Sequence, residues 1–238
     1  MAPLSKTQID RLGDRLKKGP PTDNDLRLLN EYRLSFGPTY DFVIRTIREK
    51  LQLNPTGRPA KSTSSIAEKL RRESIRLSQV QDIAGCRVVI SDVLAQDQTI
   101  ATLNETFSDA RIVDRRINPS YGYRAVHVIV AHDQLSVEIQ IRTSLQHFWA
   151  ELSERLADVV DSNIKYGGGN NDIREPLSAA SESIVILENL ERKFGVGSAM
   201  SGTQRATWLA FHQLVMSLKN ALTENFREVL SKFETPQG

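Results

Sequence analysis

The sequence predicts an α+β protein: a mixed β-sheet core flanked by helices, with helical N- and C-terminal extensions. Two observations predict this class. Runs rich in β-branched residues are confined to the middle of the chain, from about residue 83 to residue 142. Segments with apolar residues at helical spacing lie before and after that stretch. Helices that precede and follow a block of strands are typical of the α+β class.

Composition agrees with a folded globular protein. The chain has 238 residues, of which 39% are hydrophobic and 25% are charged. No run of about eighteen apolar residues is present, so we expect no membrane span. Residues 1–18 lack the apolar run of a signal peptide, and the single cysteine, Cys86, excludes an internal disulfide and a multi-cysteine zinc site. We therefore expect a cytoplasmic protein.

Before the sheet, the pattern predicts four helices, and a loop marked by Pro55, Gly57 and Pro59 precedes the last of them. Gly19-Pro20-Pro21 ends the first helix, and Gly37-Pro38 breaks the chain after the second. The four helices cover residues 5–18, a segment starting at Asp23 or Asp25, the stripe from Phe42 to Leu51, and residues 62–74 with Ser62 as N-cap.

In the middle of the chain we expect strands at 85–91, 111–113, 125–131 and 135–142, with a helix at 97–107. His132-Asp133-Gln134 is turn-like, so the last two strands should form an antiparallel hairpin.

After the sheet we expect helices at 143–160, 174–193 and 203–232, a flexible loop at 165–169 and a small-residue linker at 195–202. The apolar stripe of the last helix is most simply core that packs on 174–193, and self-association into a homo-oligomer is the alternative. The predicted regions are therefore an N-terminal helical region (1–55), a core (56–170) and C-terminal helices (171–238).

Polar residues alternate along the strand that contains Glu138. Glu138, Gln140 and Arg142 share one face, which in an isolated strand would be a solvated face. Asp82 leads into another strand, and alone it reads as a turn or helix-terminus acid. If the two strands lie close together, Asp82 and Glu138 would hold Mg²⁺ jointly with substrate phosphates.

Two further features point to a nucleotide or nucleic acid. Between Arg58 and Arg87 there are seven basic residues and three acidic ones, which suits phosphates but also fits a solvated helix face. The turn-rich segment 118–127 contains Gly122, which allows close backbone approach, and Tyr121 and Tyr123, whose rings would stack on a base or pack on the core.

Four ordered motifs from about Gly57 to Gly169 resemble the synthetase domain of the RelA/SpoT family, in the short form called small alarmone synthetases. They begin at Arg58, Asp82, Gly122 and Glu138. The resemblance implies a nucleotidyltransferase-like fold and transfer of the β,γ-pyrophosphate of ATP to a nucleotide 3′-hydroxyl.

The resemblance also assigns site residues. The catalytic residues would be Glu138, Asp82 and Gln140, and Asp82 and Glu138 would be the Mg²⁺ ligands. ATP would be bound by Arg58, Lys61, Ser65, Lys69, Arg72 and Arg87, with Arg58 and Arg87 against adenine. The acceptor would be bound by Tyr123, Arg124, His127 and Arg142.

Two departures from the family pattern leave three functions open. Ser120 and Tyr121 stand where guanosine-nucleotide synthetases usually carry a lysine and an asparagine, and Arg58 lies one residue further from Lys61 than usual. Segments 145–154 and 165–169 resemble a toxin branch that modifies the 3′-CCA end of tRNA. The alternatives are an alarmone synthetase of the stringent response acting on GDP or GTP, a tRNA-modifying toxin with an antitoxin partner, and a non-catalytic nucleotide- or RNA-binding regulator.

Overall fold

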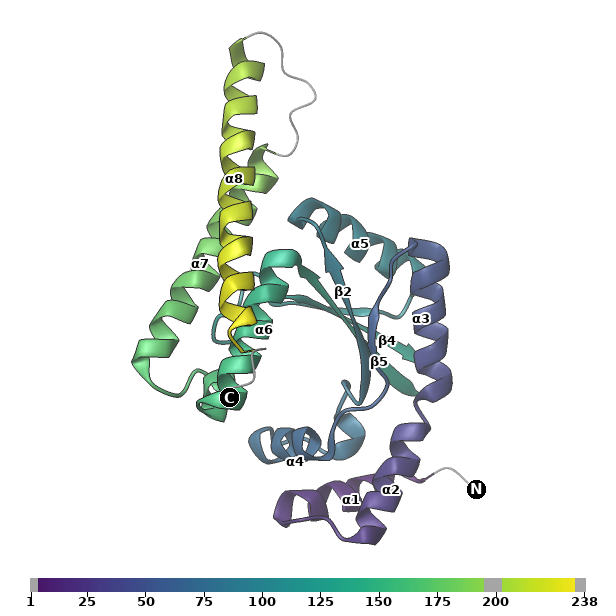
Figure 1. Cartoon of the computed structure of the whole chain (residues 1–238). Coiled ribbons are helices and arrows are strands. Elements are labelled where there is room, and N and C mark those ends of the chain that lie inside the picture. The colour runs from purple at the N-terminus through teal and green to yellow at the C-terminus, as the bar shows by residue number, and fades with distance from the viewer. Residues whose placement is uncertain (1–3, 195–202, 234–238) are drawn as a thin grey trace. The chain divides into compact units, whose positions relative to one another are not determined.

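The structure is a computed structural model that describes residues 4–194 and 203–233 (Figure 1). The elements are α1 (Lys6–Lys18), α2 (Asp23–Leu34), α3 (Gly37–Leu51), β1 (Thr56–Arg58), α4 (Thr63–Arg72), η1 (Leu77–Gln79), β2 (Ala84–Ile90), α5 (Val93–Thr106), β3 (Arg111–Asp114), β4 (Val126–His132), β5 (Leu135–Thr143), α6 (Ser144–Val159), η2 (Ser162–Tyr166), α7 (Asn171–Phe194) and α8 (Thr203–Ser231). The predicted α+β class is confirmed. The expected linker at 195–202 lies outside the described residues.

Five strands form one sheet in the order β1-β2-β5-β4-β3. A loop was expected around Pro55, Gly57 and Pro59, and this was wrong for residues 56–58, which form the strand β1. The strand β1 pairs antiparallel with β2, with Thr56 opposite Arg87 and Arg58 opposite Gly85. Proline and glycine normally indicate a loop, but here both prolines lie just outside the strand. An edge strand of three residues also needs few ladder hydrogen bonds, so the glycine is tolerated within it.

The hairpin of β4 and β5 agrees with the sequence pattern. Asp133 and Gln134 connect the strands, and both have left-handed φ angles, 49° and 65°. Two positive-φ residues between strands make a tight turn whose twist matches the twist of the strands. Positions 137, 139 and 141 are fully buried on one face of β5, as the alternation predicts.

Helix starts follow local capping chemistry. Ser62 caps α4 by accepting a bond from the Ser65 amide at 3.2 Å, as expected. The break expected at Gly37-Pro38 lies just before it, at residues 35–36, and Gly37-Pro38 begins α3, because proline is favoured in a first helical turn, where its missing N–H is not needed. The helices α5 and α7 begin at Val93 and Asn171, earlier than the expected residues 97 and 174.

The chain divides into two compact units. The first contains residues 1–88, 102–112 and 127–140, and the second contains residues 89–101, 113–126 and 141–238. In the second unit α8 packs against α6 and α7 (Figure 1). Val215 and Phe226 are buried there, whereas Leu209, Leu214 and Leu218 are exposed. The predicted core role of the last helix therefore holds for only part of its apolar stripe.

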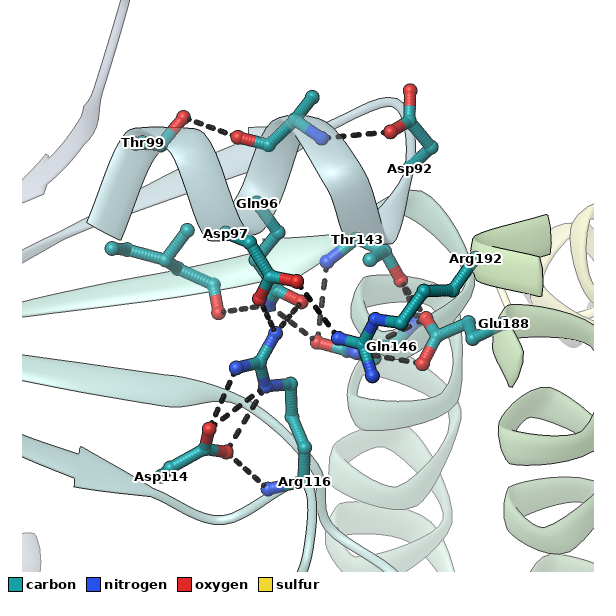
Figure 2. A network of polar contacts seen from close by, with 12 residues as sticks. Asp92, Gln96, Asp97, Thr99, Asp114, Arg116, Thr143, Gln146, Glu188 and Arg192 are labelled. Carbon is teal, nitrogen blue, oxygen red and sulfur yellow. Dashed lines mark hydrogen bonds and ion pairs between the residues drawn. The ribbon is translucent and has the colours of Figure 1, made fainter. Parts of the chain in front are cut away.

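A polar network cross-links α5, α6 and α7 within the second unit (Figure 2). Buried Glu188 of α7 accepts bonds from Thr143 and from Gln146 of α6, and Gln96 of α5 donates to Gln146 at 3.0 Å. Arg116 bridges Asp114 and Asp97. The contacts among Gln96, Thr143, Gln146 and Glu188 hold the helix ends in place because they satisfy groups removed from water.

Within residues 4–194 and 203–233, no helix is both long enough and apolar enough to cross a lipid bilayer.

Candidate active site

Asp82 is the centre of a basic cluster in the first unit. It lies in the segment just before β2 rather than inside the strand, and its exposed fraction is 7%. Lys61 donates to one carboxylate oxygen and Lys69 donates to the other at 3.0 Å. The Arg58 guanidinium donates to the Asp82 carbonyl at 3.2 Å, so three of the predicted ATP-binding residues surround this one residue.

The positions of these cations follow from the local fold. The Lys61 amide donates to the Ile83 carbonyl at 2.7 Å, which anchors the start of the α4 segment beside Asp82. Lys69 projects from α4, whose Ile66 and Leu70 are buried. Arg58 belongs to β1, the neighbour of β2. The two lysines lie 21 and 13 positions from Asp82 in sequence, and only the fold brings them to it.

Charge governs the titration of Asp82. Burial by itself would raise the pKa of its carboxyl group, but the ammonium groups of Lys61 and Lys69 outweigh burial and lower the pKa to about 2. Burial also lowers the pKa of Lys61, although Asp82 opposes this shift. Asp82 is therefore an anion at neutral pH, and it keeps two cations together in a partly buried place.

Glu138 lies in a second polar cluster of the same unit. His127 Nδ1 is 2.8 Å from one of its carboxylate oxygens, and the Gln140 amide nitrogen donates to the other at 2.8 Å. Glu138 and His127 are each only 9% exposed, so Glu138 does not lie on the solvated face that an isolated strand would give it. Burial raises the pKa of Glu138, but the contacts with His127 and Gln140 outweigh burial and lower it.

Asp82 and Glu138 lie close enough to interact, since the Asp82 charge acts to raise the pKa of Glu138. Gly85 of β2 explains the close approach of the strands. A Cβ atom at Gly85 would stand 2.7 Å from the Glu138 carbonyl oxygen, so only glycine fits there without displacing a strand. Sequence reasoning did not single out Gly85, although a glycine inside a strand is the known signal of such an approach.

The two carboxylates fit the donor set that Mg²⁺ takes. Mg²⁺ usually binds one or two carboxylates and completes its shell with water and substrate phosphates. Among the described residues no group of three or more His, Cys, Asp or Glu side chains has the arrangement of a metal site. Two carboxylates would leave most of the Mg²⁺ shell to water and substrate phosphates.

The remaining predicted ATP residues lie along β2 and α4. Arg58 and Arg87 face the same side of the β1–β2 ladder, because Arg58 is opposite Gly85 and Arg87 is opposite Thr56. Ser65 is in the first turn of α4, and the Ser62 hydroxyl donates to its hydroxyl at 2.7 Å. Arg72 is the last residue of α4 and forms an ion pair with Glu73 at 3.1 Å.

The other predicted acceptor residues belong to the second unit. Arg142 stacks over the Tyr123 ring at 4.9 Å and donates to its hydroxyl at 3.0 Å. Arg124 donates to the Ser181 hydroxyl of α7 and to the Arg116 carbonyl. It lines a polar cavity of about 370 Å³ together with Arg116, Glu188 and Arg192. The structure thus brings Tyr123 and Arg142 together and directs Arg124 to α7.

A tight turn presents the loop before Tyr123. Tyr121 and Gly122 have φ angles of 54° and 89°, and Ser120 pairs with Tyr123 across the turn. Gly167 supports this turn, since a Cβ atom there would meet the Tyr121 ring at 2.1 Å. Tyr121 is nevertheless 65% exposed. The three glycines at 167–169 predicted only a flexible loop. The sequence pattern did not indicate that Gly167 packs against the Tyr121 ring.

Comparisons with known proteins agree on one family. A family model described as "Region found in RelA / SpoT proteins" matches residues 57–158. The GTP pyrophosphokinase YjbM of Bacillus subtilis is 33% identical over 152 residues, which cover 56% of this chain and 67% of that protein. An uncharacterised protein of Mycobacterium tuberculosis is 35% identical over 220 residues, which cover 87% of this chain and 76% of that protein.

Solved structures give the same result. Small alarmone synthetase 1 from Bacillus subtilis, bound to its product pppGpp, matches with a TM-score of 0.52 and 26% identity, covering 72% of this chain and 96% of that chain. The same protein bound to AMPCPP matches with a TM-score of 0.50 and 28% identity, covering 75% of this chain and all of that chain.

Proposed function

Because the chain belongs to the RelA/SpoT family, we propose that it transfers the β,γ-pyrophosphate of ATP to the 3′-hydroxyl of GDP or GTP and so makes the alarmone (p)ppGpp. The observation that carries this proposal is the grouping of the basic cluster around Asp82 with the carboxylate of Glu138 in one compact unit. Relatives named for GTP pyrophosphokinase activity and for a pppGpp product support the guanine nucleotide as acceptor.

The donor side supplies positive charge where the triphosphate would lie. Asp82 already orders Lys61 and Lys69, so little further side-chain entropy would be lost when their remaining N–H groups bind phosphate oxygens. Lys61 also precedes the N-cap of α4, where the helix dipole favours an anion. Transfer of a phosphoryl or pyrophosphoryl group depends mostly on positioning and charge stabilisation, which this cluster provides.

The adenine would lie between Arg58 and Arg87. Diagonal neighbours on one face of an antiparallel pair are about 7–8 Å apart. That spacing is about twice the 3.5–4.0 Å contact distance of carbon atoms, so a planar base fits between two guanidinium planes. The extra residue between Arg58 and Lys61 does not prevent this, because Arg58 is placed by its pairing with Gly85.

Glu138 would activate the acceptor. Its carboxylate takes the proton of the 3′-hydroxyl as the 3′-oxygen bonds to the β-phosphorus of ATP. The bond between the β-phosphorus and the oxygen that bridges it to the α-phosphate breaks, and AMP leaves with that oxygen. Asp82 and Glu138 would hold Mg²⁺, which when bound neutralises charge on the β- and γ-phosphates.

A tRNA acceptor is the second candidate. The exposed ring of Tyr121, presented by a tight turn, offers a stacking surface for an unpaired base such as those of a 3′-CCA end. The sequence also lacks the lysine and asparagine that the family's guanosine-nucleotide synthetases carry in this loop. In this case Tyr123, Arg124 and Arg142 would bind the terminal nucleotide, and an antitoxin would be the regulatory partner.

One reaction separates the candidates. The protein is incubated with γ-labelled ATP, Mg²⁺, GDP, GTP and deacylated tRNA together, and labelled products are resolved. Labelled guanosine tetra- or pentaphosphate is the expected result, whereas label on tRNA alone would replace the first proposal with the second. E138Q should lower turnover by about 10²–10⁴-fold while ATP binding persists. The control E105Q changes an exposed glutamate of α5 and should keep full turnover. ATP binding without turnover on any acceptor would leave a non-catalytic regulator.

A further inference from the structure

We propose that His127 is a positioning residue for Glu138: its Nδ1–H group, together with the Gln140 amide, holds the Glu138 carboxylate in one orientation for the acceptor hydroxyl. The resemblance assigns His127 to contacts with the acceptor, whereas the positioning role acts through Glu138. It rests on the proposed function, because it specifies how Glu138 acts in that reaction.

The geometry of the three side chains carries the inference. His127 belongs to β4, whereas Glu138 and Gln140 belong to β5, the next strand in the sheet. Each carboxylate oxygen of Glu138 has its own nitrogen partner at 2.8 Å. The terminal torsion of a glutamate side chain is broad by nature, so its carboxylate plane is set only by outside contacts. Two nitrogen partners on separate oxygens set that plane.

The contact also defines which imidazole nitrogen faces Glu138. An ionised carboxylate can only accept hydrogen bonds, so Nδ1 carries the proton that points to Glu138. This nitrogen is therefore occupied by the carboxylate and does not face a substrate. Acting through Glu138 is the role that agrees with the observed bond.

The contacts with His127 and Gln140 leave some lone-pair sites of the Glu138 carboxylate available. A carboxylate has about four lone-pair sites, and the two nitrogen donors occupy one on each oxygen. The remaining sites can accept the acceptor hydroxyl or a metal ion. Burial of both residues strengthens the contact, because competing water is largely excluded.

Two substitutions at one position separate the two roles of His127. In His127→Asn the amide nitrogen is bonded to Cγ, as Nδ1 is, and it can donate to Glu138. In His127→Gln the amide nitrogen replaces Nε2 and not Nδ1. We expect H127N to retain most of the wild-type kcat and H127Q to lose about 10–100-fold in kcat with little change in the KM of the acceptor. The reverse order, with a raised acceptor KM in H127N, would overturn the inference.

A control and a direct readout complete the test. H132N changes a histidine at the end of the β4–β5 hairpin and should keep wild-type kcat. Nitrogen-15 spectra of the imidazole, assigned by comparison with H127N, should show a proton on Nδ1 of His127 in the wild type. A wild-type His127 whose Nδ1 carries no proton refutes the proposed contact. These spectra need no turnover, so they test the contact between His127 and Glu138 even if no acceptor reacts. A failure of every acceptor to react would instead refute the proposed function.

Discussion

Replacing Asp82 with asparagine tests whether the lysine cluster is held by charge. Asp82→Asn keeps the shape of the side chain and removes its charge, leaving Lys61 and Lys69 without their counter-ion. The folded protein lowers the pKa of Asp82 from 3.8 to about 2. The difference of about 1.8 between these pKa values, at 1.36 kcal/mol per pKa unit, gives about 2 kcal/mol of folding free energy at neutral pH.

The pH dependence has a definite sign. The folded pKa is lower than the unfolded pKa, so the ionised carboxylate stabilises the fold at pH values above about 4. This contribution is lost as the pH falls from about 4 to about 2, where both states bind the proton. Wild type and D82N should therefore differ by about 2 kcal/mol at pH 7 and converge below pH 4.

Urea denaturation followed by far-UV circular dichroism is the suitable assay. Both tryptophans, Trp149 and Trp208, lie in the second unit, so their fluorescence would not follow the unit that contains Asp82. EDTA keeps divalent ions from binding to the carboxylates. D109N, which changes an exposed aspartate after α5, serves as the control and should shift stability by less than about 0.5 kcal/mol.

Two outcomes would refute this reasoning. The first is a D82N effect at pH 7 no larger than that of D109N. The second is a D82N effect that stays constant as the pH falls below 4. Combining D82N with K61M adds a further check, because residues in contact usually show a coupling energy of about 0.5–3 kcal/mol. Strict additivity of the two changes would show that the ion pair contributes nothing to the fold.

Two glycine substitutions test the close approaches in each unit. Gly85→Ala should destabilise the protein by about 1–3 kcal/mol and reduce turnover, because the new methyl group meets the Glu138 carbonyl and pushes β2 from β5. Turnover is measured as AMP release, and a wild-type rate would contradict this prediction. Gly167→Ala should destabilise the second unit by a similar amount, since φ is +74° and the Tyr121 ring occupies the space, and tryptophan fluorescence during urea denaturation measures it. Gly19→Ala, which meets nothing within 4 Å, is the open-space control; because Gly19 lies in the first unit, G19A and G167A are compared by far-UV circular dichroism, and equal effects would rule out the contact.

The local pattern of the chain was sufficient to predict most elements and the order of the motifs. Ser62 caps its helix through a bond to a residue three positions away, and the alternation along β5 puts positions 137, 139 and 141 in the core. Both features depend only on neighbours within one segment, so they can be read from sequence. The same pattern failed at β1, because pairing with β2, not the local turn residues, decides that segment.

The arrangement of the site required the tertiary structure. Glu138 on an alternating strand looks like a solvated residue, and only the packing of β4 and β2 beside β5 buries it and supplies His127 as its partner. Asp82 looks like a turn residue until the fold brings Lys61 and Lys69 to its two oxygens. The sequence thus singled out Asp82 and Glu138 as candidates, because their motifs are local. Their partners, burial and pKa shifts were decided by contacts between distant segments, which no local pattern records.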